Sequence, residues 1–321
     1  MRKKKLSLQQ QKRIKLRQTK QKDDYLADNT PVEKGLVLAQ YSRKVDVLAI
    51  STQQIIRCHL RNNLQPLTVG DRVTWQQTQD NKGVITAVLE RKSVLLRPDG
   101  LGQLKPVAAN IDHIYLVIAQ DPSPQPHLID RYLVAAEQIG IPVSFVINKI
   151  DLGYIDPLQP LFAYYEKLGY PIFPVSTKTQ LGLAELRSHM VAKTSILVGQ
   201  SGVGKSSLIN KLVDQAHAKI GALSSGKTKG KHTTSQSTLF LFNDEGGIID
   251  SPGIREFHLT HLKRAEVYLG YRELHTLLGK CRYRNCQHEE EPGCAIKSFM
   301  LEGDMPVSRQ QSLHYILNNS T

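Results

Sequence analysis

Residues 35–88 alternate between short apolar runs and polar, turn-forming segments. The runs have the length and β-branched content of strands, and they lie at residues 35–39, 45–49, 54–60, 71–75 and 83–88. This succession predicts a small closed β-barrel, with the oligonucleotide-binding (OB) fold as the leading candidate. Trp75 ends an alternating run, so we expect its ring, like the Cys58 thiol, to lie in the barrel core. Trp75 and Tyr41 could alternatively stack on the bases of a single-stranded nucleic acid.

From residue 110 to residue 257 the apolar runs alternate with amphipathic segments of helical length. Strands are predicted at 111–119, 143–147, 172–175, 194–198 and 248–250, and helices at 128–139, 160–168, 183–191 and 206–212. Because helices rather than hairpin turns connect these strands, we expect a mostly parallel sheet in an α/β domain. After residue 260, a helical stretch, a Cys/His cluster and a final helix near 307–317 predict a small, mostly helical domain.

Positive charge is concentrated at the start of the 321-residue chain, which has a net charge of +13. Ten of the 42 Lys and Arg residues precede the first acidic residue, Asp23, and the rest of the chain carries 32 basic and 29 acidic residues. Such an arm is typical of a nucleic-acid-binding tail, with a solubilising terminus as the alternative. We therefore divide the chain into a basic flexible arm (1–33), an OB-fold RNA-binding domain (34–106), an α/β domain (107–259) and a C-terminal domain (260–321).

The location of the protein in the cell is predicted from the length and position of its apolar runs. None approaches the roughly 18 residues of a membrane-spanning helix, and no apolar segment of a secretory signal follows the basic N-terminus. We expect a cytoplasmic protein with no membrane partner.

Three of the four cysteines lie within fourteen residues, and a histidine stands among them. In a cytoplasmic chain this clustering favours a metal over disulfides. The set comprises Cys281, Cys286, His288 and Cys294. Three thiolates and one imidazole suit one tetrahedral, structural Zn²⁺. A disulfide or buried free thiols are the alternatives.

One segment between a predicted strand and a predicted helix fits the phosphate-loop pattern G-x-x-x-x-G-K-[ST]. Its residues are Gly199, Gln200, Ser201, Gly202, Val203, Gly204, Lys205, Ser206 and Ser207. The glycines let backbone N–H groups surround phosphate oxygens at the helix N-terminus. We expect Lys205 to act in catalysis by reaching the β- and γ-phosphates, and the Ser206 hydroxyl to ligate Mg²⁺.

Selection of the base is predicted at the ends of two other strands. The first motif is Asn148, Lys149, Ile150 and Asp151, and the second is Ser176, Thr177 and Lys178. We expect Asp151 to accept hydrogen bonds from guanine N1–H and its exocyclic amine, while Asn148 donates to the base edge and the Lys149 stem covers its face. Residues 176–178 would support the same base. Adenine lacks this donor pair, so the motif predicts GTP and GDP as ligands rather than ATP.

Two further segments are expected to respond to the γ-phosphate. Asp250 and Gly253 belong to a D-x-P-G sequence, in which Asp250 would hold the Mg²⁺ shell and the Gly253 N–H would contact the γ-phosphate. Residues 224–235 are rich in Gly, Lys and Ser, as is typical of a mobile switch loop. Thr233 and Thr234 are both candidates to complete the Mg²⁺ shell, and the spacing does not choose between them.

Intrinsic turnover is predicted to be slow. Ile254 follows the D-x-P-G sequence, where many GTPases carry a Gln that positions water. A hydrophobic side chain cannot orient water, so we take His232 as a candidate catalytic residue alongside Thr234. A solvated loop residue or an RNA contact is the alternative for His232.

The order of these motifs differs from that of ordinary GTPases, in which the phosphate loop comes first. Here both base motifs precede it, and the switch threonines and D-x-P-G follow it. The order predicts a circularly permuted GTPase domain, which is tolerable because domain termini lie at the surface and often close together. D-x-P-G then leads directly into the C-terminal domain, so we expect the nucleotide state to be transmitted to the metal cluster.

This assembly resembles the ribosome small subunit-dependent GTPase A (RsgA) family over nearly the whole chain. The matching stretches are 148–151, 199–207, 232–234, 250–253 and 281–294. The resemblance implies a GTP hydrolase of late 30S subunit maturation that binds 16S rRNA near the decoding region. It also implies stimulation by the small subunit and the release of another maturation factor. A His in the switch loop and a hydrophobic residue after D-x-P-G also match the family, whereas the long basic arm is not part of its pattern.

The predicted function is therefore GTP hydrolysis on a ribosomal particle by a monomer. One rival is a permuted GTPase of the large subunit, against which the barrel and the zinc cluster argue. A second rival is a nucleotide-gated RNA-binding module with negligible catalysis. A third, an ATP-dependent kinase, conflicts with the role predicted for Asp151.

Overall fold

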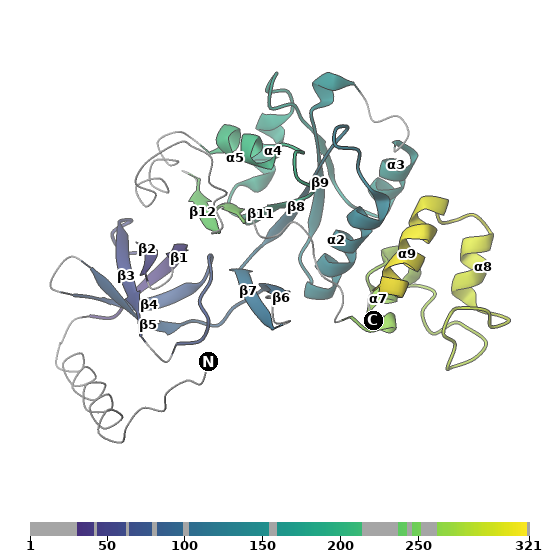
Figure 1. The fold of residues 1–321 in the computed structure, drawn as a ribbon, viewed down its shortest axis with the longest axis horizontal. Helices are drawn as coiled ribbons and strands as arrows, with labels where there is room; N and C mark the ends of the chain where they lie inside the picture. The colour runs from purple at the N-terminus through teal and green to yellow at the C-terminus, as the bar shows by residue number, and fades with distance from the viewer. Residues whose placement is uncertain are drawn as a thin grey trace, which may run out of the picture.

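The computed structural model describes nine segments of the chain, which are residues 31–41, 44–61, 64–78, 82–98, 103–153, 159–213, 237–242, 246–251 and 262–319. A β-barrel and a C-terminal group of helices lie on opposite sides of a central α/β unit (Figure 1). Among the helices of these segments, none has the length and apolar character needed to cross a membrane.

The barrel confirms the five strands predicted from the sequence. They are β1 (Glu33–Tyr41), β2 (Lys44–Ala49), β3 (Ile55–Leu60), β4 (Arg72–Gln77) and β5 (Gly83–Val88). The strand order β1-β2-β3-β5-β4 closes through pairing of β4 with β1. Trp75 and Cys58 are buried in the core, as predicted, and burial raises the pKa of the Cys58 thiol to about 12. Gly83 allows this packing, because a Cβ there would lie 2.7 Å from the Trp75 ring.

A hairpin that the sequence pattern does not predict joins the barrel to the α/β unit. It consists of β6 (Val94–Pro98) and β7 (Leu104–Ala109). The buried Asn110 side chain follows the hairpin, donates to the Gly70 carbonyl oxygen of the barrel at 2.9 Å, and accepts from Lys92 N–H. The division that we place after residue 106 falls within β7 and stays a prediction.

The central sheet is mostly parallel, as predicted, with the order β10-β9-β8-β11-β13-β12. Its strands are β8 (His113–Ala119), β9 (Val143–Asn148), β10 (Ile172–Pro174), β11 (Thr194–Val198), β12 (Thr238–Leu241) and β13 (Gly247–Asp250). The sequence pattern does not predict β12, which runs antiparallel to β13. The carboxyl ends of β8, β9 and β11 meet at one edge, where open α/β sheets bind their ligands.

Four predicted helices cover the two faces of this sheet in separate buried clusters. One face carries α2 (Pro126–Ile139) and α3 (Gln159–Lys167), and the other carries α4 (Leu183–Met190) and α5 (Lys205–Leu212). Helix α2 begins with Pro126 and is capped at its C-terminal end by Gly140, which has a φ of 67°. These are the favoured residues at the two ends of a helix.

The C-terminal part is helical, as predicted, and packs on α2. Its elements are α7 (Arg264–Leu269), the 3₁₀ turn η3 (Arg272–Leu274), α8 (Ala295–Leu301) and α9 (Val307–Asn319). Two arginines attach it to the α/β unit. Arg309 of α9 pairs with Asp130 of α2 at 2.5 Å, and Arg272 pairs with Glu137 of α2 at 2.6 Å. The two acids stand two helical turns apart, on the same face of α2.

Candidate nucleotide site and metal centre

The predicted phosphate loop connects β11 to α5, in the strand–loop–helix setting that the motif requires. Gly199 adopts a φ of 136°, and a Cβ there would lie 2.2 Å from the Val117 carbonyl oxygen, so the loop lies directly on β8. The Val203 side chain is buried beneath the loop. Lys205 Nζ donates to the carbonyl oxygens of Gly199 at 2.7 Å and Gln200 at 2.6 Å. The ammonium group is therefore held against the loop backbone that the motif assigns to phosphate.

The first base motif is tied to this loop through Asn148. Its buried Nδ2 donates to the Val203 carbonyl oxygen at 2.9 Å, across 55 residues of sequence. Gly204 makes room for the amide, because a Cβ there would lie 2.3 Å from Nδ2. The amide that we expect to reach the base thus also braces the phosphate loop. Contact between Asn148 and a base stays a prediction.

The two base motifs meet at Asp151. Its exposed carboxylate accepts a hydrogen bond from Ser176 Oγ at 2.6 Å, and Ser176 itself is buried. The same Oγ accepts the N–H groups of Lys178 at 3.2 Å and Thr179 at 3.1 Å. A chain of hydrogen bonds therefore orients the Asp151 carboxylate, and Thr179 is a supporting residue that the motif alone does not identify.

Lys149 stands beside the segment that follows β8. It adopts a left-handed backbone with a φ of 64°, and its Nζ donates to the Asp121 carbonyl oxygen at 2.6 Å. Pro122 of the same segment lies next to Gly202 of the phosphate loop. Residues 121–122 thus link the base motif with the phosphate loop, a role for which the sequence offers no motif.

Asp250 ends β13 on the phosphate side of the site. Burial raises the pKa of its carboxyl, and the nearby positive charge of Lys205 opposes the shift. The exposed Ser206 hydroxyl lies in the first turn of α5. A carboxylate and a hydroxyl are oxygen ligands of the kind that Mg²⁺ prefers. Five predicted residues lie outside the described segments: His232, Thr233, Thr234, Gly253 and Ile254.

The sequence reasoning misses one hydrogen bond on this side. Ser251, the variable residue of D-x-P-G, is 6% exposed, and its Oγ lies 2.7 Å from the Oγ of Ser237, the residue before β12. The two serines are 14 residues apart and belong to no common motif, so the sequence does not indicate that they pair. The pairing of β12 with β13 is what places them side by side.

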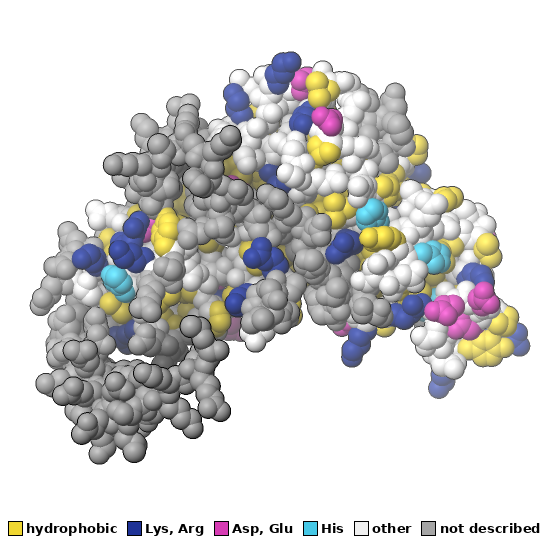
Figure 2. Space-filling model, viewed as in Figure 1, with side chains coloured by type: hydrophobic (Ala, Val, Ile, Leu, Met, Phe, Trp, Pro, Cys, Tyr) yellow, Lys and Arg dark blue, Asp and Glu magenta, His cyan; other side chains and the backbone are white. Residues whose placement is uncertain are grey.

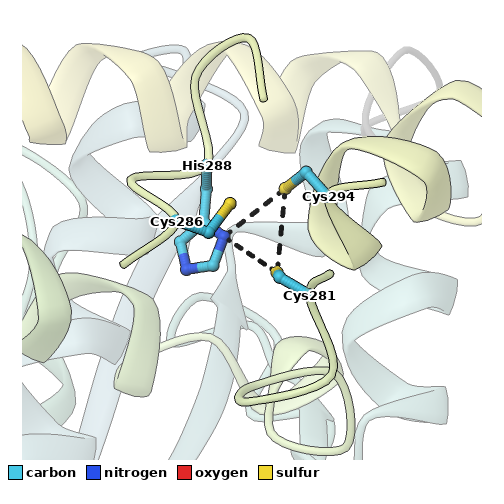
Figure 3. A group of neighbouring side chains, drawn as sticks. All are labelled: Cys281, Cys286, His288 and Cys294. Carbon is cyan, nitrogen blue, oxygen red and sulfur yellow. Dashed lines mark hydrogen bonds between the residues drawn. The ribbon is translucent and has the colours of Figure 1, made fainter. Parts of the chain in front are cut away.

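The four predicted metal ligands converge between η3 and α8 (Figure 3). Cys281 Sγ and Cys294 Sγ each lie 3.4 Å from His288 Nδ1 and 4.0 Å from each other. The ligand atoms of the whole set lie within 4.8 Å of one another. Tetrahedral Zn²⁺ would place such atoms about 3.5–3.8 Å apart. The cluster therefore fits a zinc ion with only small movements of its ligands.

Hydrogen bonds around the cluster hold its loop. The Cys294 sulfur accepts the Lys297 N–H at 3.4 Å, which makes it the N-cap of α8. The Glu291 carboxylate accepts the N–H groups of Gln287 at 2.6 Å and Glu289 at 2.9 Å. Such contacts orient the ligands of a metal site before the ion binds.

Comparison with known proteins places the chain in a family. A family model described as RsgA GTPase matches residues 88–260. The protein named Small ribosomal subunit biogenesis GTPase RsgA from Azotobacter vinelandii is 47% identical over 296 residues, which cover 90% of this chain and 86% of that protein. Its namesake from Hahella chejuensis is 47% identical over 286 residues, covering 87% and 82%. The chain belongs to the RsgA GTPase family.

Two solved structures agree with this assignment. YjeQ from Thermotoga maritima has a TM-score of 0.71 and 30% identity, covering 90% of this chain and 99% of its own. YloQ, described as a circularly permuted GTPase, has a TM-score of 0.70 and 27% identity, covering 90% and 95%. The permuted order that we predict from the motifs is thereby confirmed. As an RsgA GTPase the chain is a GTP-hydrolysing enzyme, which implies Mg²⁺ with its nucleotide, and its Cys₃His set could hold a zinc ion.

Proposed function

We propose that this RsgA GTPase acts in biogenesis of the small ribosomal subunit, binding the 30S particle and hydrolysing GTP when stimulated by it. The observation that carries the proposal is the similarity, over most of the chain, to relatives named for that role. We further propose a monomeric, cytoplasmic protein that helps to release another maturation factor.

At the nucleotide site we assign the base to Asp151, oriented by Ser176, and the phosphates to the loop and Lys205. Mg²⁺ bound with GTP would draw charge from the phosphate oxygens, and Ser206 and Asp250 are the described residues that would hold it. Water attacks the γ-phosphate in line with the leaving oxygen, and loop N–H groups stabilise the charge that develops.

The remaining residues of the site are proposed from the sequence and the family resemblance. Thr234, or its neighbour Thr233, would complete the Mg²⁺ shell, and the Gly253 N–H would contact the γ-phosphate. His232 would help to place the attacking water, because Ile254 cannot. Partner-stimulated turnover that survives His232→Ala would remove this role.

Ribosomal RNA would contact the barrel. Lys and Arg side chains gather on its visible face (Figure 2). Exposed basic residues of the barrel and hairpin include Lys34, Lys44, Arg72, Lys92, Arg97 and Lys105. Positive side chains bind phosphate backbones regardless of sequence. Near the metal centre, which we propose holds one structural zinc, Arg282 and Arg284 flank the exposed ring of Tyr283 and would supply a second contact.

The proposal is tested by measuring GTP turnover alone, with purified 30S and with purified 50S particles. We expect the 30S particle, but not the 50S particle, to stimulate GTP turnover. Stimulation by 50S would favour the large-subunit alternative, and no turnover under any condition would favour a gated binding module.

Guanine selection is tested with Asp151→Asn, which should shift the nucleotide preference from GTP to XTP. The matched control is Asp121→Asn, which changes another exposed carboxylate beside the site but leaves the backbone carbonyl that binds Lys149. An unchanged preference in Asp151→Asn would contradict the assignment of the base.

A further inference from the structure

The GTPase sheet does not end at β12, because barrel strand β1 pairs with it. Ala39 of β1 lies opposite Thr238 of β12, and Thr238 lies opposite Asp250 of β13. One row of paired residues thus runs from the barrel to the acid on the Mg²⁺ side of the site. Ser237, which bonds Ser251, directly precedes this row.

A β-bulge in β1 lies next to this contact. The pairing of β1 with β2 shifts register between Val37 and Ala39, which makes Leu38 the extra residue. A bulge re-aims side chains and bends the strand. Val37 faces the barrel core, whereas Leu38 is 5% exposed and belongs to the buried cluster of the α/β unit, with Leu239 of β12 and Ile249 of β13.

The position of strand β12 depends on its pairing with β1. It is four residues long, and its other partner, β13, is equally short. On its far side β13 is held by β11, whereas the second neighbour of β12 is β1. The barrel that supplies β1 is fixed to the α/β unit at a second place, where Asn110 bonds the Gly70 carbonyl oxygen. Strand β1 is therefore a rigid edge against which β12 is held.

We propose that Leu38 and the β1 bulge form a positioning element for GTP hydrolysis. By holding β12 against β13, they keep Asp250 and the Ser237–Ser251 hydrogen bond in place. Leu38 touches no reacting group and acts through Asp250. A ligand that shifts the barrel would therefore change the rate of hydrolysis through β1.

The test compares Leu38→Ala with Val37→Ala, which truncates the adjacent side chain of the same strand but faces the barrel core. Two readouts are needed: kcat and KM for GTP, and the factor by which Mg²⁺ slows release of a fluorescent GDP analogue. Leu38→Ala is expected to lower kcat at least about threefold, with a smaller change in KM, and to weaken the Mg²⁺ effect. Val37→Ala should leave both readouts within about twofold of the parent, because the row at Asp250 is untouched.

Wild-type kcat and Mg²⁺ effect in a folded Leu38→Ala protein would overturn the proposal. Equal losses in both variants would also overturn it, since they would reflect general destabilisation of the barrel. If Leu38→Ala does not fold, the milder Leu38→Val takes its place in the same comparison. The test uses intrinsic turnover of the full chain, so its outcome does not depend on the proposed ribosomal role.

Discussion

Replacing Arg309 with methionine is expected to weaken the attachment of the C-terminal helices to α2. The Arg309 side chain is 1% exposed, and its two carboxylate partners, Asp130 and Glu273, are 0% and 3% exposed. Tyr165 also donates to Asp130, at 2.5 Å, and the guanidinium lies over the Tyr271 ring at 4.4 Å. At this degree of burial, solvent is a poor substitute for a lost partner.

The expected cost follows from that burial. Removing one partner of a buried ion pair destabilises a protein by about 3–5 kcal/mol, because the other charge stays buried without compensation. Methionine fills most of the vacated volume, so the cavity adds little. Arg309→Met leaves two buried carboxylates without their positive partner. We therefore expect a loss of stability in the upper part of this range near neutral pH.

Acid should reduce the cost. Burial raises the pKa of Asp130 even with Arg309 present, and the arginine charge opposes that shift. Without Arg309, the folded-state pKa rises further above its unfolded value. At a pH between the unfolded and the folded pKa of Asp130, the folded variant then binds more protons than its unfolded chain. Its stability deficit should therefore shrink as the pH falls through the raised pKa.

Urea denaturation separates the parts of the molecule. Loss of helical circular dichroism reports on the α/β unit and the C-terminal helices, whereas fluorescence of Trp75, the only tryptophan, reports on the barrel. The matched control is Arg272→Met, whose side chain is 28% exposed and whose partner Glu137 is 19% exposed. Water can replace that pair in part, so a smaller loss is expected. Equal losses in the two variants, or a deficit in Arg309→Met that does not change with pH, would refute the reasoning.

Three further predictions concern the phosphate loop, the metal centre and acid stability. Gly204→Ala should abolish GTP binding measured by fluorescence titration, because its Cβ would lie 2.3 Å from Asn148 Nδ2 in a backbone with a φ of 97°; tight binding would contradict the loop geometry. Cys286→Ser should lose zinc measured by atomic absorption, whereas Cys58→Ser, outside the cluster, should retain it; equal zinc content in both would exclude the proposed ligand set. Burial lowers the pKa of His113 from 6.5 to about 4, so this neutral group stabilises the fold above pH 6.5 and the contribution is lost as the pH falls toward 4. In urea titrations, His113→Gln should therefore lose less stability over that interval than the parent chain, and an unchanged pH profile would mean that the imidazole is not buried neutral.

The position of the phosphate loop between β11 and α5 is predictable, because a short run of consecutive residues specifies it. Gly199 and Gly204 mark backbone conformations that other residues avoid, and the lysine and serine that follow are fixed by the same short pattern. The bond from Asn148 to Val203 is not predictable, since it joins residues 55 apart whose approach depends on how β9 and β11 flank β8.

The missed strands have local causes. In β7, Pro106 and Lys105 interrupt the apolar alternation that marks a strand, and in β12 only four residues are paired. Arg309 illustrates a different limit. An arginine on a terminal helix is expected from the sequence to face solvent. Arg309 is instead buried against Asp130, 179 positions earlier in the chain. Buried charge is a property of the assembled molecule, which periodicity cannot reveal.

The two flanking modules attach to different parts of the α/β unit and by different means. The barrel joins through backbone pairing at β12, in the row that ends at Asp250 on the phosphate side. The C-terminal helices join through buried charge on α2, which begins just after residues 121–122, beside Lys149 and Gly202. Backbone pairing fixes the register of β12 on β1, so a displacement of the barrel would carry β12 with it, whereas the buried ion pair holds α9 against α2. The architecture therefore favours the barrel as the module that modulates hydrolysis and the C-terminal helices as the support that keeps the base side of the site in place.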